Sequence, residues 1–159
     1  MANTKTTINA VMYPQPNEIP IDIEKTIKAL ERNKFVVHYF ETGAEAVDYL
    51  QSRIQNKCVA IGDSHTLLEL KVHDALSEVN ENITDIQRPL PGESFRDTAL
   101  RTMGRDVFLT SVNALSQTGE MVNIDGTGNR VAASLFGSQE VFFVLGVNKI
   151  TPDLASAIY

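Results

Sequence analysis

The amino-acid sequence predicts an α/β protein, a three-layer sandwich in which helices cover a mainly parallel β-sheet. Short apolar or β-branched runs alternate along the chain with segments of helical periodicity, the order of elements that builds a parallel sheet. In the predicted strand over 140–147, the run VFFVLGV is apolar at consecutive positions, as in a strand buried on both faces. The 159 residues show no internal repeat or linker, so we expect a single domain over residues 1–159.

The first elements are a helix and a strand. A helix begins after Pro20, because Ile23, Ile27 and Leu30 recur at the i, i+4, i+7 spacing of one helical face. The run FVVHYF at 35–40 has the composition and length of a strand.

The next helix has a recognisable start. Thr42 and Glu45 have the spacing of a capping box, which predicts a helix over 43–54. The apolar run KCVAIGD at 57–63 then indicates a strand that ends in a turn. The periodicity continues as one helix over 64–79.

The middle of the chain contains a break. Residues 82–87 predict a strand, and the prolines and glycine of 89–92 then interrupt regular structure. A helix follows that carries Phe95, Ala99 and Met103.

The second half adds an antiparallel element. We expect a strand over 106–115, a turn at Gly119, a short strand over 120–124, and a helix that begins at about residue 129. These elements predict a hairpin around Gly119.

The chain ends in a short helix after the strand over 140–147. Thr151 is expected to cap this helix, with Pro152 at its first position. Leu154 and Ile158 lie on one face of it, which favours docking against the same domain or against another chain, including a second copy.

Composition limits the function classes. The net charge of −6 and the pI of about 5.0 argue against a nucleic-acid binder, which usually has a basic face. Cys58 is the only cysteine, so we expect no internal disulfide and no Cys/His metal site. The N-terminus lacks the apolar run of a signal peptide, and the longest apolar run is too short to cross a bilayer. We therefore expect a cytoplasmic protein with no membrane segment, metal or cofactor.

The loop GDSHT joins a predicted buried strand to a helix, where ligands usually bind in parallel α/β folds. Its amides and the hydroxyls of Ser64 and Thr66 could hold an anion at the start of that helix. Alternatively, Asp63 or Ser64 only caps the helix, and Gly62 only permits the turn. His65 could act as a base or be an ordinary helix-start residue.

The loop NIDGTGNR combines a glycine-rich turn with several polar side chains. Arg130 falls in the first turn of the following helix, where the helix dipole disfavours a cation by about 0.3–1 kcal/mol. Either Asp125 offsets this cost as a local ion pair, or the planar guanidinium of Arg130 binds a carboxylate or phosphate through two parallel hydrogen bonds. Asp125 is also the best candidate for an acid–base residue.

The segments that carry these loops resemble the LUD domain family, which contains lactate utilisation proteins. The resemblance is densest in FLTSVNALSQTGEMVNIDGTGNRVAASLFG and VFFVLGVNKITPDLASAI, and AIGDSHTLLEL fits the family's upstream loop. It implies the fold of sugar-phosphate isomerases and CoA transferases. Some members of the family are subunits of a bacterial three-protein system that oxidises L-lactate to pyruvate alongside iron–sulfur partners.

The resemblance also selects the candidate site residues. The family's hallmark positions correspond here to Gly62, Ser64, Thr66, Asn113, Gly119, Asn123, Asp125, Gly126, Gly128, Asn129, Arg130, Asn148 and Lys149. We take all of these except Gly119 as candidate ligand-binding residues. Asp63 stands where many relatives have a second glycine, which adds negative charge beside the proposed anion site. The last helix stops at Tyr159, whereas many relatives continue, some with cysteines suited to a cluster.

Three functions remain open at this point. The chain could be a lactate-utilisation-type subunit that binds a small carboxylate or phosphorylated metabolite, alongside iron–sulfur oxidoreductase subunits. It could instead be a non-catalytic module that stabilises redox partners, or an independent isomerase-like or transferase-like enzyme. Fold alone does not choose among these.

We expect the purified protein to contain no stoichiometric iron, zinc or flavin, because the sequence has no metal-ligand cluster and no complete nucleotide fingerprint. Elemental analysis and an absorbance spectrum check this expectation. A bound chromophore would contradict it.

Overall fold

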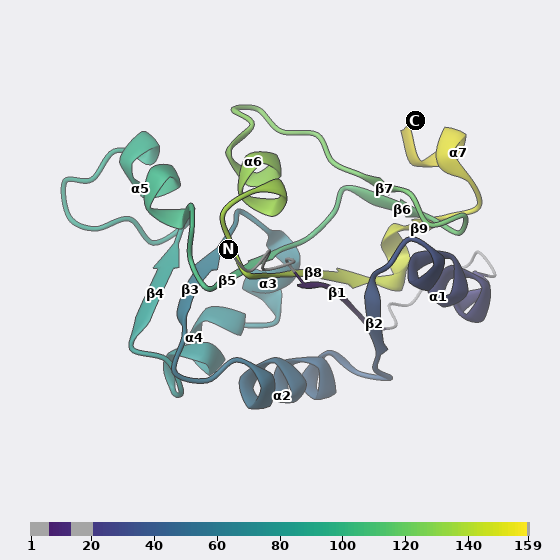
Figure 1. Ribbon diagram of the computed structural model, residues 1–159, viewed down its shortest axis with the longest axis horizontal. Helices are drawn as coiled ribbons and strands as arrows, with labels where there is room; N and C mark the ends of the chain where they lie inside the picture. The colour runs from purple at the N-terminus through teal and green to yellow at the C-terminus, as the bar shows by residue number, and fades with distance from the viewer. Residues whose placement is uncertain (1–6, 14–20, 159) are drawn as a thin grey trace, which may run out of the picture.

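Six parallel strands form the central sheet in the part of the chain that the computed structural model describes, residues 7–13 and 21–158 (Figure 1). The strand order is β2-β1-β8-β5-β3-β4, and every neighbouring pair is parallel. The bounds are β1 Thr7–Tyr13, β2 Val36–Tyr39, β3 Cys58–Ile61, β4 Asn82–Asp85, β5 Val107–Thr110 and β8 Glu140–Gly146. The mainly parallel sheet predicted from the sequence is confirmed.

Helices cover both faces of this sheet and make the three layers of the sandwich (Figure 1). One face packs against α2 Gly43–Arg53, α3 His65–Glu69 and α4 Val72–Ser77. The other face packs against α1 Ile23–Arg32, α5 Phe95–Thr102 and α6 Asn129–Leu135. Strand β8 contributes to both cores, because Phe142 faces the first and Phe143 the second. The buried side chains of residues 141–146 confirm the prediction of a strand covered on both faces.

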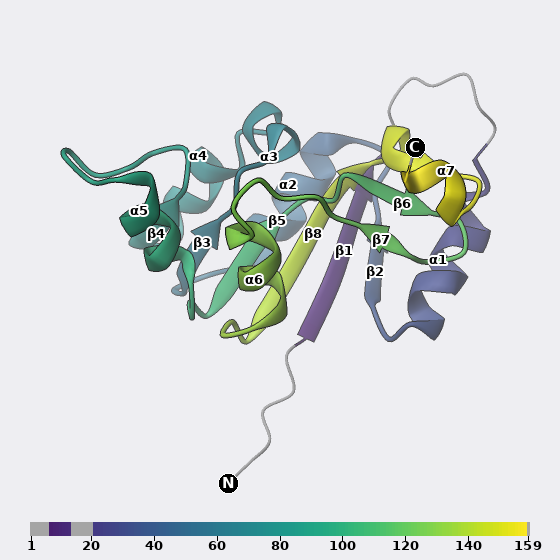
Figure 2. The ribbon, with the colours of Figure 1, turned by 90° about the horizontal axis from the view of Figure 1, so that it is seen from above.

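A small second sheet lies beside the main one and extends toward α1 (Figure 2). It contains β6 Ala114–Ser116, β7 Met121–Val122 and β9 Ile150–Thr151 in the order β7-β6-β9. Strands β6 and β7 are antiparallel and turn at Gly119, so the predicted hairpin is confirmed. Strand β9 follows the short helix η1 Val147–Lys149, and α7 Leu154–Ile158 packs against β6 and β9.

Strand β1 was not predicted, although it lies inside the sheet between the edge strand β2 and β8. Its register places Asn9 opposite Phe142 of β8, and Asn9 is buried. Asparagine is depleted in strands, so this residue interrupts the apolar pattern by which a buried strand is recognised. The strand is specified by its two neighbours rather than by its own composition.

The single helix predicted over 64–79 is two helices, because Lys71 adopts a left-handed conformation with φ of 53°. The break has a packing reason. In a continuous helix, Val72 would lie about 140° around the axis from Leu67. With the break, both side chains are buried in the same core.

Two further predictions require correction. The strand predicted over 106–115 is divided between β5 and β6, which belong to different sheets, and the chain leaves the main sheet at Ser111. Thr151 does not cap the last helix, because it pairs with β6 as part of β9. The carboxylate of Asp153 instead accepts a hydrogen bond from the amide of Ser156 at 2.8 Å.

Other local predictions hold. Thr42 and Glu45 form the expected capping box, with reciprocal hydrogen bonds between each side chain and the other residue's amide. Ser64 caps α3 by accepting a hydrogen bond from the amide of Leu67. The longest described helix, α2, has 11 residues, and none of the helices within 7–13 and 21–158 could span a bilayer.

The hairpin turn at Gly119 fits tightly against α1, which generates a testable prediction. Gly119 has φ of +98°, and an added Cβ would lie 3.0 Å from the backbone of Ala29. We expect Gly119→Ala to lower the free energy of unfolding by roughly 2–4 kcal/mol, because strain at positive φ and overpacking add. Urea denaturation measures this loss.

Gly92 is the matched control for this variant. It has φ of +79° and open space around an added Cβ, so Gly92→Ala should cost only the strain, about 1 kcal/mol. Equal losses at Gly119 and Gly92 would show that the contact with α1 does not constrain the turn.

Candidate functional site

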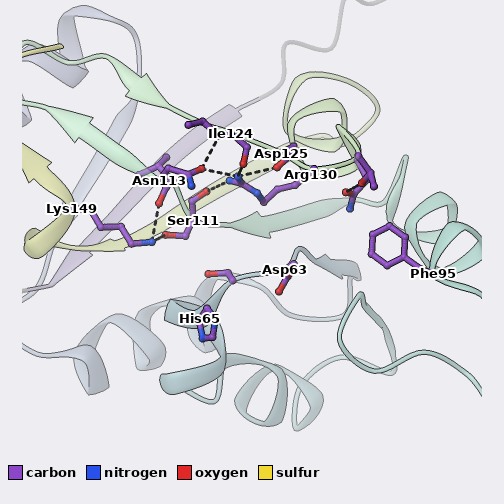
Figure 3. A pocket seen from close by; sticks show the side chains of 14 residues that line it. Asp63, His65, Phe95, Ser111, Asn113, Ile124, Asp125, Arg130 and Lys149 are labelled. Carbon is purple, nitrogen blue, oxygen red and sulfur yellow. Dashed lines mark hydrogen bonds and ion pairs between the residues drawn. The ribbon is translucent and has the colours of Figure 1, made fainter. Parts of the chain in front are cut away.

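Three neighbouring strands of the main sheet end at one edge and supply the walls of a cavity. Strands β3, β5 and β8 are adjacent, and their carboxyl ends lead directly to Gly62, Ser111 and Val147. The glycine-rich loop between β7 and α6 closes over the same edge. The cavity has a volume of about 460 Å³ and is lined by residues from all four connections (Figure 3). This is where parallel α/β folds usually bind ligands.

The structure brings most of the candidate residues to this cavity. Those that line it are Ser64, Asn113, Asp125, Gly126, Asn129, Arg130 and Lys149. The others lie behind the wall or beside it: Gly62, Thr66, Asn123, Gly128 and Asn148. Among these, Thr66 is buried and its hydroxyl accepts a hydrogen bond from Ser111 Oγ at 3.5 Å, while Asn148 lies exposed in η1.

The guanidinium of Arg130 is surrounded by protein acceptors (Figure 3). Nη1 donates to one carbonyl and one amide oxygen, and Nη2 faces a carbonyl, an amide and a carboxylate oxygen. These acceptors are Ser111 O at 3.0 Å, Asn123 Oδ1 at 2.6 Å, Asn113 Oδ1 at 2.9 Å, Ile124 O at 3.0 Å and Asp125 Oδ1 at 2.9 Å. Because both Nη atoms already have acceptors within the protein, they are not available for a bidentate contact with an external anion in this structure.

Asp125 accounts for a cation in the first turn of α6. Its Oδ1 pairs with Arg130, and its Oδ2 accepts a hydrogen bond from the amide of Val131 at 2.7 Å. The residue at the N-cap position, Gly128, has φ of 79° and no side chain, so the Asp125 carboxylate serves as the cap from outside the helix. A carboxylate there satisfies a free amide and offsets the dipole. The local ion pair, one of the two alternatives, is therefore present.

Asn113 joins the two chain segments that Arg130 bridges. Its Oδ1 accepts hydrogen bonds from the amide of Ile124 at 2.9 Å and from Arg130. The backbone amide of Asn113 donates to Val122 O at 3.0 Å. The exit from β5 and the exit from β7 are thereby held at a fixed separation.

Lys149 enters the cavity from the end of β8, on the side opposite α6 (Figure 3). Its Nζ donates to Ser111 Oγ and to Val112 O, each at 2.8 Å. Burial of the half-buried ammonium lowers the pKa of Lys149 below its usual 10.5, and the positive charge of Arg130 lowers it further. Glu69 acts in the opposite direction with a smaller effect.

The loop after β3 forms the facing wall. Asp63, Ser64 and His65 line the cavity there, and Asp63 Oδ1 accepts a hydrogen bond from Gln87 Nε2 at 2.6 Å. Gly62 is required by close packing, because an added Cβ would lie 3.0 Å from the ring of Phe108. The turn and cap roles proposed for this loop are thus present, and its polar atoms also face the cavity.

Sequence reasoning missed Ser111, which is central to the site. Its carbonyl accepts from Arg130 and its hydroxyl from Lys149, so one residue links the two cations. The signal that could have found it is the carboxyl-end rule, which applies to β5 as much as to β3. The strand predicted over 106–115 extends past Thr110, where β5 ends, so Ser111 was not placed at the carboxyl end of a strand.

The described ranges, 7–13 and 21–158, contain no group of three or more His, Cys, Asp and Glu side chains that could hold a metal ion. Cys58 lies in β3, partly buried, away from the cavity-lining residues. The groups that face the cavity are suited to binding a polar ligand and to proton transfer.

The chain matches a protein-family model. The model described as the LUD domain matches residues 23–159, which include all the loops around the cavity. Comparisons with curated proteins and with solved structures found no match.

The contacts of Arg130 predict a structural role that mutation can measure. The side chains of Arg130 and Asp125 are 12% and 9% exposed, so removal of one partner leaves a buried charge. We expect Arg130→Ala to lower the free energy of unfolding by about 3–5 kcal/mol without any ligand. Arg130→Lys should restore little of this, because an ammonium cannot reach acceptors arranged for a planar group.

A double-mutant cycle separates the pair from the rest of the network. Asp125→Ala should also lower stability, and the double mutant should lose less than the sum of the single losses. Additive losses, or an unchanged stability of Arg130→Ala, would show that the pair does not hold the loop.

Proposed function

The chain belongs to the LUD domain family, and on that premise we propose that it binds a small anionic metabolite, a carboxylate or a phosphate, in the cavity above β3, β5 and β8. The resemblance of its loops to lactate utilisation proteins supports a place in the oxidation of L-lactate to pyruvate, alongside iron–sulfur oxidoreductase subunits. The contacts of Lys149 in the cavity support the binding part of this proposal.

Lys149 is the observation that carries the proposal. Its ammonium is half-buried in the cavity wall, and among the described residues no carboxylate lies within ion-pair distance of it. Buried cations are normally paired, since transfer of a charge out of water is costly. Two of its three N–H groups have acceptors in Ser111 and Val112, which leaves one for a ligand. A bound carboxylate or phosphate oxygen would supply the missing partner.

The neighbouring groups support the same ligand class. Ser64 and Asn129 line the cavity and offer side-chain donors, and the loop at Gly126 brings backbone close to the cavity without a covering side chain. Arg130 holds the loop in place rather than contacting the ligand, because its Nη atoms bind acceptors within the protein. We therefore assign direct anion contact to Lys149 and the arrangement of the loop to Arg130.

A second candidate function is a non-catalytic interaction module. Leu135 and Phe136, adjacent residues where α6 ends, are 79% and 85% exposed. Leu154 and Ile158 of α7 are also exposed, on a separate part of the molecule (Figure 2). Large apolar side chains exposed together often mark a protein interface. Sedimentation of the wild type and of Leu135→Ser/Phe136→Ser would test this candidate. Loss of self-association in the variant would support a homo-oligomer, and identical monomeric behaviour would remove the support for self-association at this surface.

A thermal-shift screen with lactate, pyruvate, inorganic phosphate, sugar phosphates and CoA tests the binding proposal. A ligand at 100 times its dissociation constant should stabilise the protein by about 2.7 kcal/mol. Lys149→Met should abolish this response and leave the ligand-free protein folded, because the change removes a half-buried charge that has no carboxylate partner within residues 7–13 and 21–158. Lys25→Met, an exposed lysine of α1, is the matched control and should respond like the wild type. An undiminished response in Lys149→Met would contradict the proposal.

The pH dependence of binding has a definite sign. An anion favours the ammonium form of Lys149, so binding raises its pKa from the lowered value of the free protein. Affinity should be constant below the free protein's pKa and fall as the pH rises above it, at a pH below the 10.5 of an ordinary lysine. Calorimetric titration of lactate or phosphate across the alkaline range measures this fall. Affinity that stays constant through that range would exclude Lys149 as the partner of the anion.

A further inference from the structure

The amine of Lys149 is held in a geometry that suits a nucleophile. Nζ has two fixed neighbours at 2.8 Å, the carbonyl oxygen of Val112 and the hydroxyl of Ser111. A carbonyl can only accept, so one N–H always points at Val112. When a second N–H points at Ser111, the remaining tetrahedral position of the nitrogen holds either a third proton or a lone pair.

We propose that Lys149 Nζ forms an imine with the carbonyl carbon of a small oxo acid that binds in the cavity. The inference rests on the anion-binding function proposed above and specifies its ligand as an aldehyde or ketone that also carries a carboxylate. It assigns a covalent step to Lys149 and a positioning role to Ser111.

The surroundings of Lys149 favour the reactive amine form. Burial disfavours the ammonium, and so does the charge of Arg130, which contacts the same residue, Ser111, through its carbonyl. A lysine is activated as a nucleophile in this way, by desolvation or by a neighbouring cation. The carboxylates that could oppose this effect are either distant or engaged: Glu69 acts on Lys149 from α3, Asp125 pairs with Arg130, and Asp63 accepts from Gln87.

The reaction balances without an oxidant or reductant. The lone pair of Nζ attacks the carbonyl carbon, and the electrons of the C=O double bond move to its oxygen. A proton passes from nitrogen to that oxygen to give a carbinolamine. A second proton, the one that the ammonium released when the amine formed, converts the hydroxyl into a leaving water molecule, and the nitrogen lone pair forms the C=N bond of a protonated imine. The hydroxyl of Ser111, 2.8 Å from Nζ, is positioned to transfer protons in these steps.

The oxo acid class follows from charge. The protonated imine has the same positive charge as the ammonium that it replaces, so a carboxylate on the same ligand keeps its electrostatic partner after the covalent step. A neutral aldehyde would leave this half-buried charge as poorly compensated as before, which costs free energy. The cavity of about 460 Å³ is large enough for a small oxo acid such as pyruvate or glyoxylate.

Borohydride reduction tests the imine directly. The folded, full-length protein is incubated with pyruvate or glyoxylate, reduced with sodium borohydride, and analysed by intact mass and peptide mapping. The expected product has the mass of the probe less one oxygen atom on the peptide that contains Lys149. The adduct should form faster there than on exposed lysines, because a larger fraction of a lysine with a lowered pKa is in the amine form.

Three variants and one ligand serve as controls. Lys149→Arg keeps the charge and lacks a nucleophilic amine, so it should lose the adduct, whereas Lys25→Arg should form it like the wild type. Ser111→Ala should form the same adduct more slowly, by at least about tenfold if the hydroxyl transfers protons. Lactate has the carboxylate but no aldehyde or ketone carbonyl, so it should stabilise the protein in the thermal-shift assay and give no adduct.

The outcomes distinguish this inference from the binding proposal. Stabilisation by lactate and pyruvate without an adduct on Lys149 would overturn the imine and leave anion binding intact. An adduct on Lys149 without stabilisation by lactate would support the imine and contradict the binding of simple carboxylates. Adducts spread evenly over exposed lysines, and unchanged in Lys149→Arg, would overturn the inference.

Discussion

The guanidinium of Arg130 is the interaction on which the arrangement of the site depends. It joins the end of β5, the exit of β7 and the start of α6, three segments that are far apart along the chain or separated by turns. A planar group with several fixed donors can hold such segments at defined angles, which a lysine cannot do. Asp125 makes this cation tolerable at a helix start, since one carboxylate oxygen neutralises Arg130 and the other caps α6.

Ser111 connects this network to Lys149 on the other side of the cavity. Its carbonyl is fixed by Arg130 and its hydroxyl contacts Lys149, so two cations share one residue without a shared carboxylate. Arg130 is neutralised by Asp125, whereas the positive charge of Lys149 is left to interact with whatever enters the cavity. Partial burial and the nearby charge of Arg130 lower the pKa of Lys149. The anion binding and the imine that we propose both rest on this partly desolvated amine, which has no ion-pair partner in the described part of the chain.

Local sequence patterns were sufficient wherever a residue acts on its own chain neighbours. The capping box of Thr42 and Glu45, the cap at Ser64 and the hairpin at Gly119 were predicted and are present. The unbroken apolar run of β8 indicated a strand covered on both faces, which in turn indicated a parallel sheet. The glycine-rich loop was identified as a candidate site because a cation at a helix start breaks a local rule, and such exceptions require a compensating partner.

The sequence by itself determined the class of fold and the two loops with polar side chains, because periodicity, capping and turn chemistry act within a few residues. Only the tertiary structure decided that Asn9 lies in a central strand, that the chain leaves the main sheet at Ser111, and that Arg130 is occupied by protein acceptors. Each of these depends on groups far apart in the chain, such as Ser111 and Lys149, which are separated by 38 positions. Contacts of this kind arise from the order of the strands and from the meeting of their carboxyl ends at one edge of the sheet. Neither of these produces a pattern among residues that are close in the sequence.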